Sequence, residues 1–465
     1  MIKPRLLPLA VASFLFVAEV AAQGVTLPDY TRAELANGTV LILVEKHDVP
    51  LVGIQASLRG GAVSDPDGLN GLSSLLAGLL EKGAGDRDAA TFAGAVAAVG
   101  GRLAARGNLE TIDISGSFLA RDADLMIALL ADMLQRPALG AEEMSKLRDR
   151  SINFIRAAKD SNLGALMSVY GGASLFGDHP YGNPVGGSEA TLQAIRHTDL
   201  LAYYDDHVGA DRLVIAVAGD FDTAIMRRTL EAAFGDWRPA RAQPMAVTDP
   251  AQQVGRRVLL VDKPGAAQTY FWIGNVGVAI DYADRAALDI ANTVYGGRFT
   301  SMLNTELRVK SGLTYGARSS LLRPSRPGSV AISSFTPTAT TVEAIDMALG
   351  VHGQLRDTGI GAEMLVSAKN YVLGQFPTRL ETAAQLARLF ARAETFALGP
   401  SYINEYGAAI AATDAEALAA VIVEVYPPLK SLVFVLLGDA ELIRESIGKY
   451  GPVTELAITE PRFRP

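Results

Sequence analysis

The 465-residue chain contains no cysteine, so disulfide bonds and thiolate metal ligands are excluded. Histidine is scarce as well. The five histidines lie at least ten residues apart, so no two share the helical spacing of a metal-binding pair. We expect each of them at a turn or on the surface: His47, His179, His197, His207 and His352.

Clusters of basic residues are also missing. The 42 lysines and arginines are outnumbered by 50 aspartates and glutamates, and the net charge is −8. Because nucleic-acid binding needs clustered Lys and Arg, we expect no nucleic-acid partner. The chain has no Gly-x-Ser-x-Gly motif and no Walker-type phosphate loop, so a serine hydrolase and an NTPase have no support. What remains is a globular protein long enough for about two to four domains.

Long apolar runs are confined to the amino terminus. Residues 1–22 begin with Lys3 and Arg5, continue with an apolar stretch, and end in the small residues Val20-Ala21-Ala22. This is the pattern of a cleaved signal peptide, with a buried or membrane-spanning helix as the alternative. The apolar stretch is short for a membrane span, and no later run reaches about 18 apolar residues. We therefore predict a periplasmic protein whose mature chain has no membrane span.

The rest of the chain mixes predicted strands and helices in an irregular order. Strands are expected at 40–44, 51–58, 111–115 and 213–218, and helices at 121–134 and 141–159. This order favours an α+β fold over a regular parallel barrel. Residues 238–256 are polar, contain prolines and lack periodicity, which is typical of a linker. We therefore predict one domain at 26–237 and a second at 257–465.

The two predicted domains begin alike. Residues 39–46 form an apolar run closed by Glu45 and Lys46, and residues 257–263 form another closed by Asp262 and Lys263. Buried strands resemble one another, but these two occupy the same place in each half. The pattern predicts a duplication, with two homologous α/β-roll domains of about 210 residues.

Several short motifs follow one another in a specific order. They are Asn37-Gly38, Val49-Pro50, Gly60-Gly61, the apolar helix between Gly71 and Gly83, His179–Gly182, Gly187-Ser188, Val217–Asp220, Gly296–Leu303 and Leu307–Tyr315. Together they resemble the pitrilysin/insulinase-type peptidases, from about Leu35 to Leu437. The resemblance implies two homologous domains per chain that form half of a clamshell around a peptide chamber.

The resemblance also locates a metal site that this chain lacks. Members of the family carry His-x-x-Glu-His on a helix, with a further glutamate ligand about 76 residues beyond the second histidine. The corresponding residues are Ser74, Ala77, Gly78 and Phe154. The nearby acid Glu81 lies one turn beyond Ala77 and has no histidine to join it. We therefore expect no metal and no cofactor in this chain.

A second family signature is intact. Residues 300–310 are predicted to form an amphipathic helix and residues 313–319 a strand. They place Arg308 and Tyr315 in the register of the Arg/Tyr pair that relatives hold opposite the zinc. A guanidinium and a phenol can orient a peptide and stabilise negative charge on a carbonyl oxygen. Without the resemblance, Arg308 would be read as a helix C-terminal charge and Tyr315 as a packed strand residue.

Loss of the metal ligands together with retention of this pair leads to a specific hypothesis. The chain is predicted to be the non-catalytic subunit of a heterodimeric zinc metallopeptidase, inactive alone. A partner subunit with His-x-x-Glu-His would hold the zinc, and Arg308 and Tyr315 would act in trans on peptides or unfolded proteins. The alternative is an inert structural or peptide-binding homologue that never joins an active peptidase.

Overall fold

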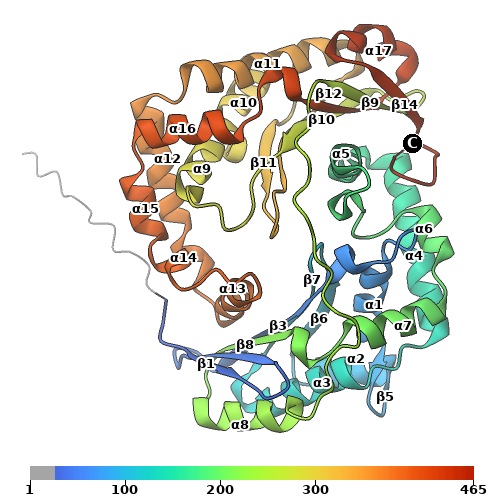
Figure 1. The fold of residues 1–465 in the computed structure, drawn as a ribbon, viewed down its shortest axis with the longest axis vertical. Coiled ribbons are helices and arrows are strands. Elements are labelled where there is room, and N and C mark those ends of the chain that lie inside the picture. Colours follow the sequence, from blue (N-terminus) through green and yellow to red (C-terminus); the bar gives the residue numbers. More distant parts are fainter. Residues whose placement is uncertain (1–26, 465) are drawn as a thin grey trace, which may run out of the picture.

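The computed structural model describes residues 27–464, so the predicted signal peptide lies outside the described residues. Two six-stranded sheets dominate it, and Figure 1 shows them at opposite ends of the molecule. The strands of the first sheet are β1 (Thr31–Glu34), β2 (Val40–Glu45), β3 (Leu51–Arg59), β6 (Arg102–Gly107), β7 (Thr111–Leu119) and β8 (Leu213–Gly219). Those of the second are β9 (Arg257–Asp262), β10 (Gln268–Val276), β11 (Arg318–Leu322), β12 (Ser329–Pro337), β13 (Val433–Gly438) and β14 (Val453–Ala457). A small ribbon joins β4 (Gly83–Ala84) to β5 (Arg87–Asp88).

The two sheets repeat one topology. Their orders are β1-β2-β8-β3-β7-β6 and, reversed for comparison, β14-β9-β13-β10-β12-β11. In each sheet the first strand of the repeat runs parallel to the last, as β2 does with β8 and β9 with β13, and the remaining pairs of the repeat are antiparallel. The outermost strand differs, because β1 is antiparallel to β2 whereas β14 is parallel to β9. The predicted α+β class and the two homologous domains are confirmed.

Helices follow the strands in matching order. The first half contains α1 (Leu72–Leu80), α2 (Ala89–Ala98), α3 (Ala123–Gln135), α4 (Ala141–Ser161), α5 (Met167–Phe176), α6 (Glu189–Ala194), α7 (His197–His207) and α8 (Thr223–Phe234). The second contains α9 (Arg285–Asn292), α10 (Met302–Asn304), α11 (Thr341–Thr358), α12 (Ala362–Gln375), α13 (Ala383–Thr395), α14 (Ser401–Asn404), α15 (Tyr406–Ala412), α16 (Ala415–Val425) and α17 (Ala440–Ile447). No helix of the described part is long and apolar enough to cross a membrane.

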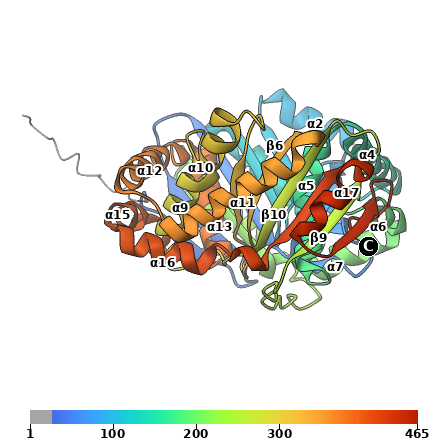
Figure 2. The same ribbon diagram turned by 90° about the horizontal axis from the view of Figure 1, so that it is seen from above.

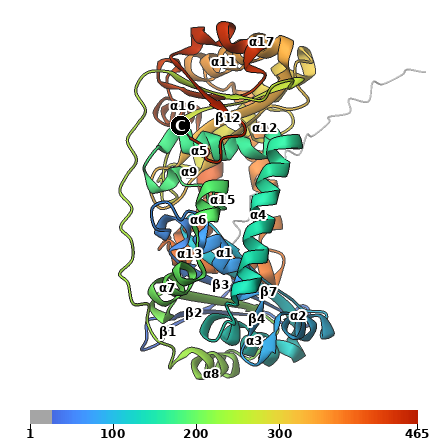
Figure 3. The same cartoon turned by 90° about the vertical axis from the view of Figure 1, so that its right-hand side faces the viewer.

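The segment between α8 and β9, residues 235–256, contains neither helix nor strand in the described structure. Figure 3 shows it running along one side of the molecule from one sheet to the other. Apart from Trp237 and Val247, which pack against the first half's core, its sequence is largely polar and contains prolines, which explains its lack of helix and strand.

Both faces of each sheet are covered. Strand β2 is buried on both sides, with Leu41 and Leu43 in one apolar cluster and Ile42 and Val44 in another. This explains why its sequence is a continuous apolar run rather than an alternating one. In the second sheet, α11 packs on the same face as Phe271, and α5 packs on the opposite face (Figure 2).

The two halves exchange a helix. Helix α13 from the second half covers β3 and β8 of the first sheet, and α5 from the first half covers β10 and β13 of the second (Figure 1). Four apolar side chains of α13 pack into the cluster that contains Ile42 and Val44 of the first sheet: Leu386, Ala387, Phe390 and Ala391. The domain boundaries drawn from the sequence did not anticipate this exchange, because each helix is an ordinary amphipathic helix in its own half.

Two glycines allow the exchanged helices to come close. A Cβ on Gly53 of β3 would lie 2.5 Å from the backbone nitrogen of Ala384 in α13. A Cβ on Gly171 of α5 would lie 2.7 Å from the ring of Trp272 in β10. Both distances are shorter than any real carbon contact, so a larger residue at either position would push the helix off the sheet.

Candidate functional site

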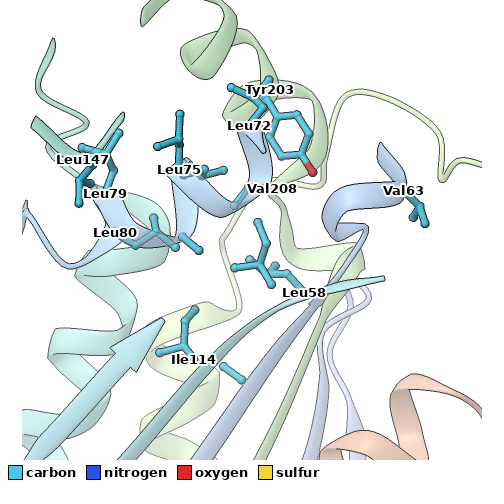
Figure 4. Close-up of a cluster of buried hydrophobic side chains, with 14 of the residues drawn as sticks. Leu58, Val63, Leu72, Leu75, Leu79, Leu80, Ile114, Leu147, Tyr203 and Val208 are labelled. Atoms are coloured by element: carbon cyan, nitrogen blue, oxygen red, sulfur yellow. The ribbon is translucent and has the colours of Figure 1, made fainter. Parts of the chain in front are cut away.

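Helix α1 carries three of the four positions predicted to correspond to the family's metal ligands, and its leucines hold it on the first sheet. Leu80 points toward Leu58 and Ile114 of the sheet, whereas Leu79 lies beside Leu147 of α4 on another side of the helix (Figure 4). Each of these side chains is at most 6% exposed. The helix is therefore positioned by apolar burial, as its sequence predicts, although it begins at Leu72 rather than at Gly68.

The amino end of α1 is fixed by a buried carboxylate. Asp65 accepts the backbone N–H groups of Gly71 at 2.7 Å and Ser73 at 2.9 Å. Burial raises the pKa of Asp65 to about 7, and the two backbone N–H groups oppose that rise only in part.

The former ligand positions on α1 are filled by close packing. The Ser74 hydroxyl donates a hydrogen bond to the Val185 carbonyl at 2.7 Å. Ala77 is 1% exposed, and a Cβ on Gly78 would touch Leu147 at 3.4 Å. An imidazole at Gly78 would therefore meet Leu147, because the neighbouring helix occupies that space.

The outer edge of β6 beside α1 is also occupied. A Cβ on Gly107 would lie 2.7 Å from the Ser74 hydroxyl oxygen, so helix and strand are in close contact. The Glu81 carboxylate accepts the backbone N–H of Ala105 at 2.6 Å. Because β6 is the edge strand of its sheet, its free backbone N–H groups could pair with an added peptide strand. The bond to Glu81 occupies one of these groups, the N–H of Ala105.

Phe154 lies on α4 and is 70% exposed. It lines a cavity of about 980 Å³ between the two sheets, together with Val185, Trp272 and Phe463. Val185, which accepts the hydrogen bond from Ser74, thus lines the same cavity as Phe154. At the position predicted to correspond to the family's carboxylate ligand, this chain presents an aromatic ring to an apolar space.

Within residues 27–464, no three His, Asp or Glu side chains converge as a metal site would require. His47 is exposed and contacts Asp220 and Glu45, at 2.6 Å and 2.9 Å. The expectation that every histidine lies at a turn or on the surface is wrong for His352, which is 2% exposed within α11. Its ring bonds to the Tyr295 hydroxyl and the Pro427 carbonyl, which compensates for its burial.

Arg308 and Tyr315 lie together. The guanidinium carbon of Arg308 lies 4.4 Å from the centre of the Tyr315 ring and 4.9 Å from that of Phe299. Tyr315 is 74% exposed and Phe299 is 61% exposed. The two rings hold the flat cation by cation–π contact, which leaves its N–H groups available to a ligand.

The local backbone differs from the prediction on both sides of this pair. Helix 300–310 is present, but α10 is short and residues Thr305–Lys310 form a π-helical turn. The predicted strand 313–319 is wrong up to residue 317, because β11 begins at Arg318. The Thr314 hydroxyl hydrogen-bonds to the backbone N–H and carbonyl of Gly316, and the Thr336 hydroxyl donates a hydrogen bond to the Leu313 carbonyl. Side chains therefore satisfy groups that a strand ladder would use, and Tyr315 sits in a turn.

Arg308 and Tyr315 open onto a second cavity of about 660 Å³. Its walls include aromatic side chains outside every segment that the sequence singled out, namely Tyr270, Phe335 and Tyr371. They come from separate elements, so no local motif announces them. Arg298 and Phe299 belong to the recognised run Gly296–Leu303, and Arg318 belongs to the predicted strand 313–319, but neither arginine was assigned a role.

A duplicated α+β fold with a vestigial metal helix defines a class of peptidase-like proteins, and comparison with known proteins identifies it. The family model for insulinase (peptidase family M16) matches residues 40–188, and the model for the peptidase M16 inactive domain matches residues 194–372. This chain belongs to the insulinase family, peptidase family M16.

Individual relatives agree with this assignment. An uncharacterized zinc protease of Mycobacterium leprae is 30% identical over 274 residues, which cover 58% of this chain and 59% of that protein. The non-peptidase homolog YmxG of Helicobacter pylori is 24% identical over 357 residues, covering 76% of this chain and 81% of that protein. A solved peptidase M16 inactive domain from Pseudomonas fluorescens shares the fold, with a TM-score of 0.81 at 21% identity over 88% of this chain and 98% of that one. The match to the mycobacterial protein spans less than two thirds of its length. The match to the inactive-domain model and the name of the H. pylori relative support an inactive homologue of the family.

Proposed function

We propose that this chain is the non-catalytic subunit of a heterodimeric zinc metallopeptidase. One observation carries the proposal. The first half has lost the metal ligands and filled their places, whereas the second half keeps Arg308 and Tyr315 side by side at an open cavity. A purely structural subunit would have no need for an exposed tyrosine and an unpaired arginine.

The partner subunit would carry His-x-x-Glu-His and the zinc, which would activate water for attack on the peptide bond. In this chain, Arg308 is held between two rings, and its guanidinium forms no ion pair within residues 27–464. Its N–H groups and the Tyr315 hydroxyl can orient the carbonyl of a bound peptide. They can also stabilise the negative charge that develops on its oxygen.

The substrates in this proposal are peptides or unfolded proteins, and the setting is the periplasm. The cavity beside Arg308 has aromatic walls and a volume of about 660 Å³, which suits side chains of an extended peptide. The proposed location rests on the amino-terminal sequence pattern alone.

The test is to co-express this chain with a metal-bearing family member and measure cleavage of an unstructured peptide. Arg308→Ala is expected to lower the rate about 10²–10³-fold without preventing assembly, and Tyr315→Phe to lower it less. Lys310→Ala is the matched control, because Lys310 lies in the same turn, bonds to Glu306 and does not line the cavity. Assembled complexes of both variants that cleave at the unaltered rate would overturn the proposal.

One finding favours the alternative, an inert peptide-binding homologue. The H. pylori relative is named a non-peptidase homolog, and the 980 Å³ apolar cavity of this chain can hold apolar side chains without any catalysis. Peptide binding by the isolated chain, with no gain of cleavage in any mixture with a zinc-bearing family member, would favour this alternative.

A further inference from the structure

The cavity beside Arg308 is lined by more positive charge than the proposed reaction uses. Three arginines line it, Arg298, Arg308 and Arg318, and no aspartate or glutamate does. Within residues 27–464, none of the three forms an ion pair. Three like charges around one space repel each other until an anion enters.

Neutral groups orient these arginines and leave their charge unbalanced. Arg298 donates to the Ser367 hydroxyl at 3.0 Å and lies 5.9 Å from the centre of the Tyr371 ring. Its Nε is buried and has no hydrogen-bond partner. Arg318 donates from Nε to the Ser333 hydroxyl at 3.1 Å. Serine hydroxyls fix a guanidinium without neutralising it, so both terminal nitrogens of Arg318 and the second terminal nitrogen of Arg298 stay available.

The walls between the arginines are aromatic. Tyr270 and Phe335 stack with ring centres 5.3 Å apart, and Phe299 and Tyr371 complete the lining. A guanidinium matches a carboxylate in planar, two-point geometry, and aromatic walls accept the apolar part of a peptide beside it. An acidic peptide satisfies both features.

We propose that Arg298 and Arg318 form a carboxylate-binding subsite beside Arg308, which selects peptides carrying a carboxylate near the position that Arg308 contacts. The inference rests on the proposed function only in taking this cavity as a peptide site. The carboxylate comes from an Asp or Glu side chain or from the free C-terminus of the peptide, since both have the same planar anion.

The experiment measures binding of fluorescent peptides to the isolated full-length chain by anisotropy, with no partner present. A short unstructured peptide containing one Glu is compared with its Gln counterpart, each with a free or an amidated C-terminus. The subsite predicts about 10-fold weaker binding when the deciding carboxylate is removed, and a preference that shrinks as salt is added. Loss of affinity in the Gln peptide identifies a side-chain carboxylate, and loss in the amidated peptide identifies the C-terminus.

Arg298→Ala and Arg318→Gln are expected to abolish the preference by lowering affinity for the acidic peptide to that of its neutral counterpart. Arg228→Ala on α8 is the matched control, because it removes one positive charge from an exposed side chain of the other half. Arg318 is exposed on β11, so its variant keeps the test valid if Arg298→Ala fails to fold.

Equal affinity for all four peptides, or an unchanged preference in both variants, would overturn the subsite. Failure of the proposed function gives a different result. A carboxylate preference that persists while Arg308→Ala complexes cleave normally would remove the catalytic role and keep the subsite.

Discussion

The two halves of this molecule share one strand order but present opposite surfaces. In the first half, the α1 face that holds the metal in catalytic relatives is packed against Leu147 and β6, and Glu81 takes an N–H of the strand edge. In the second half, Tyr315 and three arginines line an open cavity. Among the described residues, Arg298, Arg308 and Arg318 form no ion pair. In one copy of the repeat the predicted metal face of α1 is packed, and in the other the equivalent chamber-facing surface lines an open cavity with arginines.

The difference shows that losing a metal site involves more than losing its ligands. Ser74 anchors the Val185 segment, and Phe154 lines an apolar cavity, so former ligand positions have acquired structural contacts. Substitutions in the first half should therefore change stability, whereas substitutions in the second half should change binding.

The largest effect is expected from rebuilding the metal motif in the Ser74→His/Ala77→Glu/Gly78→His variant. It places a carboxylate at a position that is 1% exposed and an imidazole against Leu147. Burial of an unpaired charge and overpacking lower the unfolding free energy by about 4 kcal/mol, measured by urea denaturation. Ala90→Glu, at an exposed position of α2, controls for the added charge. Binding of one zinc ion per chain with an unchanged urea midpoint would show that α1 has room for the metal ligands and would contradict this prediction.

An intermediate effect is expected from Asp65, which fixes the amino end of α1. Because its folded pKa is about 7, the folded protein keeps a proton that the unfolded chain releases above about pH 4. The stability contributed by protonated Asp65 is thus fully present below about pH 4 and is lost as the pH rises through about 7. Relative to Asp65→Asn, the wild type should lose on the order of 3 kcal/mol of unfolding free energy over this range.

Asp88 provides the control of opposite sign. The N–H of Thr91 lowers the pKa of Asp88, so its contribution is present above about pH 4 and is lost as the pH falls. Denaturation of wild type, Asp65→Asn and Asp88→Asn across this pH range separates the two carboxylates. A wild type that gains stability relative to Asp65→Asn as pH rises would contradict the raised pKa.

The smallest effect on stability is expected at the open site. Arg308→Ala and Tyr315→Phe remove a partly exposed cation–π contact and one hydroxyl, so each should change the unfolding free energy by no more than about 1 kcal/mol. Thermal and urea unfolding check this directly. A loss comparable to that of the rebuilt metal motif would mean that the pair is part of the packed core.

Much of the fold follows from local sequence. The apolar run at Val40 and its counterpart at Val258 lie in the equivalent strands β2 and β9, as the duplication predicts. Helix α1 was recognised by its leucines, and the juxtaposition of Arg308 and Tyr315 matches the family register.

Other features depend on contacts between distant residues. Nothing near Leu386 or Phe390 indicates that α13 covers the other half's sheet. The turn at Tyr315 depends on Thr336 of β12, whose hydroxyl donates a hydrogen bond to the Leu313 carbonyl. Arg298 and Arg318 meet only through the folded cavity, and tertiary contacts of this kind override local pattern.

The exchange of α5 and α13 has a consequence for biogenesis. When the ribosome has completed the strands of the first sheet, helix α13, which covers one face of that sheet, lies more than a hundred residues downstream and has yet to be synthesised. The hydrogen bond from Arg59 to the Thr395 carbonyl joins residues 336 positions apart. Contacts this far apart in sequence slow folding, so the nascent chain stays open until nearly all of it is synthesised.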